Sequence, residues 1–165
     1  MPLDTWFPLA VYYTDLDNAA EQNSAMQEAI LQLEKEAGER RFENTAWTGD
    51  IHGVGSLHYD ERFDWLTGQV EKHCVEYLKA LGHDMDKIDL YIQRSWPIVS
   101  RKDEGVSVHA HHNANISAVY YVEVPETDDI TKAGPFIIHN SVNQNELQGG
   151  ITTEGTNAIS DWNEL

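Results

Sequence analysis

The chain has 165 residues, in which 28 Asp and Glu outnumber 11 Lys and Arg and give a formal net charge of -17. A strongly negative surface repels phosphate backbones and anionic lipid, so this composition disfavours nucleic-acid and membrane partners. The length predicts a single domain over residues 1–165, large enough to enclose a binding site.

Cys74 is the only cysteine, which excludes an internal disulfide framework and a thiolate metal cluster. We expect its side chain in the core, on the inner face of a helix. No apolar run approaches the ~20 residues of a membrane span, and residues 1–4 lack the charged start and apolar stretch of a signal peptide. These observations predict a cytoplasmic protein.

Two amphipathic helices are predicted in the first half of the chain. An aromatic segment at residues 6–13 contains Pro8 and is expected to be an edge strand or an extended lead-in. Asn18 and Glu21 then have the spacing of a capping box. The first helix continues at helical spacing through Met26, Ile30, Leu33 and Ala37 and ends at Gly38.

The second helix is predicted from about Asp60 to Gly82. Its apolar residues fall on one face and are Phe63, Leu66, Val70, Cys74, Tyr77, Leu78 and Leu81. Residues 44–58, between the two helices, are rich in glycine and predict a loop with at most a short strand. The helical support is therefore expected over about residues 15–82.

From about residue 88 the hydrophobic period changes from 3.6 to 2, which indicates a β-core. Strands are predicted at residues 88–93, 107–109, 115–124 and 135–139. Residues 140–165 are polar and contain Gly149-Gly150, so we expect a long loop or an insertion there. Helices followed by antiparallel strands predict an α+β domain, with the helices bracing a β-sandwich or barrel.

His109, His111 and His112 form the densest cluster of candidate metal ligands in the sequence. On an extended chain, residues i and i+2 project from one face, so His109 and His111 can bind one ion at ~2.1 Å each while His112 points away. Imidazole suits iron, zinc, copper or nickel, and no carboxylate lies within three residues of the cluster. The alternative is that all three are solvated loop residues.

The other histidines are weaker candidates. His52, His58, His73 and His83 have no partner at ligand spacing, so we expect them to be structural or exposed. His139 ends the strand predicted at 135–139 and either completes a triad with the first pair or caps its strand.

The sequence around these histidines resembles a known family. Trp96-Pro97-Ile98-Val99 and HAHHNANISAVYYVEVP at residues 109–125 are similar to W-x-n-v…H-x-H-p-N-a-x-x-S-G-V-Y-Y-v-x-x-P, the hallmark of a group of 2-oxoglutarate/Fe(II) oxygenases. Residues 6–8 and 134–138 extend the resemblance. The matching positions are His109, His111, Asn113, Ser117, Val119, Tyr120 and Tyr121. His112 replaces the usual proline, and Ala118 replaces the usual glycine.

The resemblance implies a double-stranded β-helix, a jelly roll of the cupin type, braced by the N-terminal helices. It also implies Fe(II) and 2-oxoglutarate as cofactors, with decarboxylation of 2-oxoglutarate to succinate coupled to hydroxylation of a C–H bond in a small-molecule or peptidyl substrate. By the same resemblance, His109 and His111 bind the metal, and Tyr120, Tyr121 and Asn113 are cofactor-binding residues.

Two details of this implied site are open. In the wider class, two histidines and a carboxylate hold the iron. Either His111 replaces the carboxylate, or His111 is the first ligand and Asn113 stands at the carboxylate position. One of Tyr120 and Tyr121 is expected to face inward and donate a hydrogen bond to 2-oxoglutarate; the alternative is that both only pack as strand residues.

Parts of the family pattern are missing. The family has a distal histidine ligand and an arginine that pairs with 2-oxoglutarate, but no arginine follows Arg101, and His139 lies too close to the first pair. A double-stranded β-helix has about eight strands, whereas four or five are predicted here. We therefore expect a fold that is incomplete at its C-terminus, belonging to a fragment or a split protein, with open sheet edges that favour homo-oligomers.

Two other functions compete with the oxygenase. One is a cupin-like metal enzyme that holds iron, nickel or zinc through histidines alone and does not use 2-oxoglutarate. The other is a non-catalytic β-sandwich binding module in which the histidine cluster is incidental.

Overall fold

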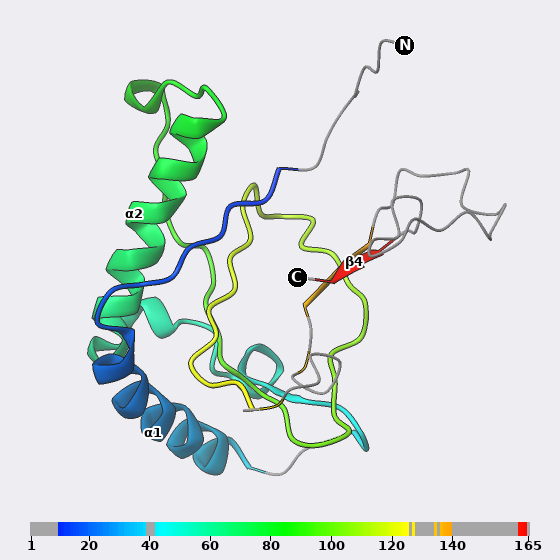
Figure 1. Ribbon diagram of the computed structural model, residues 1–165. Helices are drawn as coiled ribbons and strands as arrows, with labels where there is room; N and C mark the ends of the chain where they lie inside the picture. The colour runs from blue at the N-terminus through cyan, green and yellow to red at the C-terminus, as the bar shows by residue number, and fades with distance from the viewer. Residues whose placement is uncertain are drawn as a thin grey trace, which may run out of the picture. The chain divides into compact units, whose positions relative to one another are not determined.

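The structure is a computed structural model, and it describes residues 10–38, 42–125, 127, 134, 136–139 and 162–164. The chain divides into two units, Met1–Val122 and Glu123–Leu165. The first unit contains both long helices and the segment with the histidine cluster (Figure 1). In the described part of the chain, no helix is both long and apolar enough to cross a membrane.

Helix α1 spans Ala19–Ala37 and confirms the first predicted helix, including its end at Gly38, where φ is 88°. The predicted capping box is wrong. Asn18 lies in the left-handed region with φ 61°, and its side chain makes no capping hydrogen bond. An N-cap acceptor normally sits on extended backbone, so the left-handed turn at Asn18 places its amide away from the first-turn N–H groups.

Helix α2 spans Asp64–Ala80 and confirms the second predicted helix. A 3-10 turn, η3 (Glu61–Phe63), leads into it, and the Asp60 carboxylate caps this turn by accepting from the Arg62 backbone N–H at 3.1 Å. Cys74 lies on the predicted helix α2, but its side chain is half-buried and not part of the buried core, where the sequence had predicted it. Burial raises the pKa of its thiol, which disfavours the thiolate form.

The core of the first unit forms where α1 meets η3. Met26 and Ala29 of α1 pack with Phe63, whose side chain is only 1% exposed. The partly buried residues packed against this cluster are Ile30, Leu33, Leu57, Trp65, Leu66, Tyr120 and Val122. Apolar burial at this junction therefore joins both helices to the chain just after the histidine cluster.

Trp47 forms a second centre of burial. Strand β1 (Trp47–Thr48) pairs antiparallel with β2 (Ile98–Val99), with Trp47 opposite Val99. The Trp47 side chain is 1% exposed, and its ring stacks on that of His52 at 5.5 Å between ring centres. The glycine-rich segment thus contains the short strand expected, but its buried tryptophan was not predicted.

Gly49 begins the 3-10 helix η1 (Gly49–His52) directly after β1. A Cβ at Gly49 would lie 2.6 Å from the Pro97 ring, so this close approach requires glycine. Two more short 3-10 helices lie in the described part of this unit: η2 (Leu57–Tyr59) and η4 (Met85–Lys87).

Three predicted strands are wrong. Residues 88–93, 107–109 and 115–124 form no hydrogen-bonded strands. Their side chains alternate only in part, because Ile88 and Ile92 are half-buried while Leu90 is exposed. A strand is defined by its partner, and the period-2 pattern of one segment carries no information on whether a partner lies beside it.

The segment before α1 lies along α2, seen in Figure 1 as the blue chain beside the green helix. Tyr77 donates its hydroxyl hydrogen bond to the Ala10 carbonyl at 3.0 Å, and Tyr12 donates to the Glu76 carboxylate at 3.1 Å. Residues 10–13 form no edge strand, which leaves the alternative predicted for residues 6–13, a lead-in segment, and helix side chains hold it in place of a neighbouring strand. Residues 6–9 lie outside the described residues.

An ion pair connects the chain after β2 to α1. The Arg101 guanidinium contacts both carboxylate oxygens of Glu34, at 2.7 and 2.9 Å, and the Glu34 side chain is only 11% exposed. The Glu104 carboxylate accepts from the Arg101 backbone N–H at 2.8 Å, which closes the turn around Lys102 and Asp103. The segment that carries the histidines therefore starts from a fixed point on α1.

The second unit contains an antiparallel pair of strands. Strand β3 (Ile137–His139) pairs with β4 (Trp162–Glu164), with His139 opposite Trp162. The strand predicted at 135–139 is confirmed for its last three residues. The loop predicted over 140–165 is wrong at residues 162–164, which find a partner in β3; residues 140–161 lie outside the described part.

We predict that Phe63→Ala destabilises the protein by about 3 kcal/mol, since it leaves a cavity between α1 and α2. Phe42→Ala is the matched control, because the Phe42 side chain is 62% exposed and should change the free energy of unfolding by less than about 0.5 kcal/mol. Urea unfolding followed by circular dichroism measures both variants. Equal effects for the two would contradict this assignment of the core.

Candidate functional site

His109 and His111 lie together in the first unit. Their ring centres are 4.8 Å apart, and the ring planes are perpendicular. Two imidazoles that bind one ion at ~2.1 Å from each nitrogen have ring centres roughly 4.5 to 5.5 Å apart. The separation of the two rings therefore fits a shared metal ion, as the i, i+2 spacing predicted.

The tautomer of His109 is fixed by its own backbone neighbour. His109 Nδ1 lies 2.8 Å from the Ser107 carbonyl oxygen. A carbonyl oxygen only accepts, so Nδ1 carries the hydrogen and neutral His109 keeps its lone pair on Nε2. Metal-binding histidines commonly donate their second N–H to a carbonyl or carboxylate in this way, which orients the ring and raises its basicity as a ligand.

His111 is held between His109 and Trp96. The Trp96 and His111 ring centres are 5.5 Å apart with the planes tilted by 56°. The His111 carbonyl accepts from the Ala114 backbone N–H at 3.2 Å, which closes a turn with His112 and Asn113 at its centre. These contacts position His111, while His112 and Asn113 are exposed on the turn.

Two imidazoles, those of His109 and His111, are the candidate metal ligands that lie together among the described residues. Within the described part of the chain, no group of three His, Cys, Asp or Glu side chains is placed to hold an ion. His109 and His111 are both exposed, so the pair is open to a further ligand from solvent or from another segment. The chemistry of these two histidines fits two of the protein-ligand positions of an iron site. The other candidate ligand, His139, lies in β3 of the second unit.

Tyr120 is half-buried and Tyr121 is exposed, which agrees with the alternation that the sequence predicted for neighbours on an extended chain. Tyr120 turns inward, donates its hydroxyl hydrogen bond to Asn23 Oδ1 at 2.6 Å, and meets the Trp65 ring edge-on. Burial raises the pKa of Tyr120, and the hydrogen bond to Asn23 partly offsets this. Tyr121 is 47% exposed, and burial of its ring raises the pKa of its hydroxyl too.

The four histidines predicted to be structural or exposed, His52, His58, His73 and His83, confirm the prediction. His52 donates through Nδ1 to the Thr48 carbonyl at 2.8 Å, and His58 contacts the Ser95 hydroxyl at 2.6 Å. His73 lies 3.0 Å from the Glu76 carboxylate. His83 is exposed.

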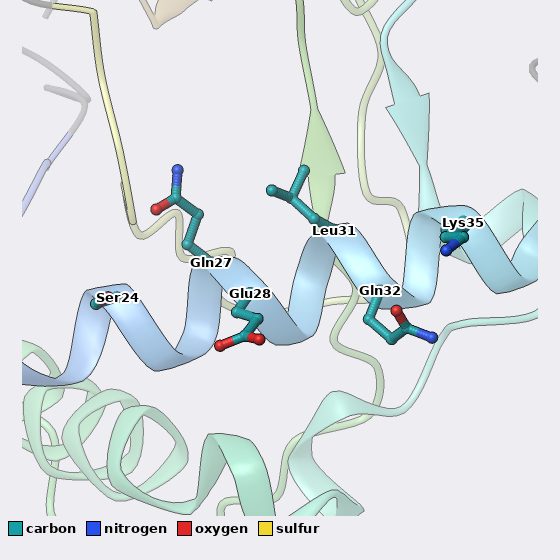
Figure 2. Close-up of a pocket in the computed structure, with 6 residues that line it drawn as sticks. All are labelled: Ser24, Gln27, Glu28, Leu31, Gln32 and Lys35. Carbon is teal, nitrogen blue, oxygen red and sulfur yellow. The ribbon is translucent and has the colours of Figure 1, made fainter.

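A separate hollow of about 470 Å³ lies along α1, lined by Ser24, Gln27, Glu28, Leu31, Gln32 and Lys35. Figure 2 shows Gln27 and Leu31 projecting to one side of the helix and Glu28 and Gln32 to the other. All the lining residues come from one helix, and none of the candidate site residues is among them. This hollow is therefore not part of the histidine site.

Comparison with known proteins identifies the segment that holds the histidine pair. Residues 94–157 match a family model described as "Putative 2OG-Fe(II) oxygenase". Over these residues the chain is similar to the 2OG-Fe(II) oxygenase superfamily. This confirms the family resemblance predicted from the sequence. The match begins at Arg94 and includes β2, the histidine pair and both tyrosines, whereas α1 and α2 precede it. No curated protein and no solved structure matches the chain.

Replacing Tyr120 with Phe should destabilise the protein by about 1 kcal/mol, because Asn23 Oδ1 loses a short hydrogen bond in a half-buried position. Tyr121→Phe removes the same atom from a 47% exposed side chain and should leave the free energy of unfolding nearly unchanged. Chemical denaturation of both variants tests this difference. An equal loss in the two variants would show that the Asn23 contact contributes nothing.

Stability should fall at high pH. Because burial raises the pKa of Tyr120 in the folded chain, the unfolded chain loses this proton first. The contribution is fully present below the ordinary tyrosine pKa of about 10 and is lost as pH rises through the raised value. Unfolding free energies at about pH 8 and about pH 11 should therefore differ less in Tyr120→Phe than in the original protein. An unchanged difference would argue against this assignment.

Proposed function

We propose that this protein is a non-haem Fe(II)/2-oxoglutarate-dependent oxygenase that hydroxylates a C–H bond of a small-molecule or peptidyl substrate. The observation that carries the proposal is the His109–His111 pair, with ring centres 4.8 Å apart inside the matched segment. In the general chemistry of this superfamily, iron and 2-oxoglutarate supply the oxidising power, and the protein binds and orients the reactants.

The proposed roles follow from the contacts of each residue. His109 binds the metal through Nε2 in this proposal, because its Nδ1–H donates to the Ser107 carbonyl. His111 binds through its ring, whose position is restricted by the contact with Trp96. Tyr121, on the exposed side, is the tyrosine we propose for hydrogen bonding to 2-oxoglutarate, since Tyr120 already donates to Asn23. Asn113, on the adjacent turn, is proposed to bind cofactor as well.

We further propose the double-stranded β-helix as the fold around this site. The antiparallel pairs β1–β2 and β3–β4 support it, as do the two helices that precede the matched segment. In such a fold the third metal ligand comes from a strand distant in sequence from the first two ligands.

The test is anaerobic addition of Fe(II), in excess, and 2-oxoglutarate to the purified full chain. We expect a visible charge-transfer band and, once oxygen is admitted, the formation of succinate. His111→Ala should abolish both signals, because it removes one of two neighbouring ligands. His112→Ala is the matched control and should retain both. A band that persists in His111→Ala, or disappears equally in His112→Ala, would contradict the assignment.

The same titrations separate the competing functions. Tight binding of nickel or zinc that is indifferent to 2-oxoglutarate would favour a cupin-like, all-histidine metal enzyme. Failure to bind any of these metals would favour a non-catalytic binding module. We expect weak metal binding in isothermal titration, because the described residues supply two imidazoles where stable sites use three or more ligands.

A further inference from the structure

Three polar side chains meet where the segment before α1 contacts α2. We call residues 10–13 the N-terminal segment. Its Tyr12 hydroxyl oxygen lies 2.9 Å from His73 Nδ1 and 3.1 Å from Glu76 Oε2. His73 Nδ1 in turn lies 3.0 Å from the same Glu76 oxygen. Each of the three atoms is therefore within hydrogen-bond distance of the other two.

This cluster joins parts of the chain that are distant in sequence. His73 and Glu76 are three residues apart on α2, so they lie on one face of the helix. Tyr12 stands 61 positions before His73. The cluster is therefore a tertiary contact, and together with the hydrogen bond from Tyr77 to the Ala10 carbonyl it attaches the N-terminal segment to the helix.

The N-terminal segment also covers the His73 ring. The Tyr12 and His73 ring centres are 5.8 Å apart, and the His73 side chain is only 18% exposed. Two titratable groups face this ring, Tyr12 from the N-terminal segment and Glu76 from the same helix. Tyr77 contacts the Tyr12 ring on another side, at 6.3 Å between ring centres. A charge on His73 is therefore balanced by Glu76 within a partly shielded contact.

The hydrogens available to the cluster determine the state of His73. An ionised carboxylate only accepts, and the Tyr12 hydroxyl has one hydrogen, which it donates to Glu76. Desolvation raises the pKa of Tyr12, and the hydrogen bond and charge of Glu76 raise it further, so this hydroxyl stays protonated. The two remaining contacts both end at His73 Nδ1. A lone pair on this nitrogen would face the Glu76 oxygen with no hydrogen between them, so the geometry requires Nδ1–H.

We propose that the Tyr12–His73–Glu76 cluster is a pH-sensitive contact, which holds the N-terminal segment on α2 most tightly when His73 is protonated. A protonated imidazole always carries a hydrogen on Nδ1 and attracts the Glu76 carboxylate. A neutral imidazole loses this attraction and can carry its hydrogen on Nε2 instead. Imidazole side chains change charge between about pH 5 and 8, so attachment should weaken as pH rises through this range.

This proposal concerns a different part of the chain from the proposed oxygenase site. The three residues of the cluster precede the segment that matches the oxygenase family, and the proposal does not depend on that function. Its consequence is that the position of the chain before α1 responds to pH, while the core around Phe63 has no part in the response.

The first experiment measures the ring nitrogens of His73 by nuclear magnetic resonance in the purified, ¹⁵N-labelled full chain. At about pH 7.5, where imidazole is largely neutral, we expect the hydrogen on Nδ1. Neutral histidine in water carries it mostly on Nε2, so this result would be specific to the cluster. A His73 Nδ1 without hydrogen would overturn the proposal, because the contact with Glu76 would then be repulsive.

The second experiment measures the heteronuclear Overhauser effect of the backbone amides of residues 11–13 at about pH 5.5 and about pH 7.5. The effect falls when a segment becomes mobile, so we expect lower values at the higher pH. His73→Gln and Glu76→Gln should both abolish this difference, because each removes one partner of the charge pair. His83→Gln is the matched control, since His83 is exposed just beyond α2, and it should retain the difference.

Tyr12→Phe separates the cluster from a general effect of pH on the fold. It removes only the hydroxyl that joins the N-terminal segment to α2, so residues 11–13 should be mobile at both pH values. Circular dichroism should show unchanged helix content in each variant, because the side chains of Tyr12 and Glu76 are partly exposed. Equal values at the two pH conditions in the original chain, or a difference that survives in Glu76→Gln, would show that the proposal is wrong.

Discussion

The burial of Phe63 against Met26 and Ala29 is the interaction on which the rest of the first unit depends. It joins α1 to the start of α2, and Tyr120 and Val122 pack on the same cluster. The segment with the histidines is therefore attached at its far end to the hydrophobic core. At its near end it is attached by the ion pair between Arg101 and Glu34. Apolar burial, one short ion pair and the isolated bridge between Gly105 and Thr45 thus position a segment that forms no strand.

The sequence predicted the helices well because helical periodicity is a local property. Both helices begin and end within a few residues of the expected positions, and Gly38 ends α1 as its lack of a side chain allows. Most of the predicted strands were wrong, because strand pairing depends on residues distant in sequence. Trp47 shows this most clearly: it is among the most buried side chains, and its partner across the ladder, Val99, is distant in sequence.

The sequence predicted the part of the candidate site that depends on the spacing of residues along the chain. The i, i+2 pattern predicted that His109 and His111 lie together, and their neighbouring rings agree. No pattern could choose between Tyr120 and Tyr121, because the choice depends on Asn23, almost a hundred positions earlier in the chain.

Both attachments of the histidine segment are on the same helix. Asn23 receives Tyr120 and Glu34 receives Arg101, and in α1 these two residues are separated by about three full turns, which brings them onto one face. Helix α1 consequently acts as a rigid spacer that sets the distance between the two attached ends of the histidine segment, which forms a loop over the helix. The loop can vary in sequence between its two ends without altering that span, whereas one residue inserted into the helix between Asn23 and Glu34 would rotate one end by about 100° relative to the other.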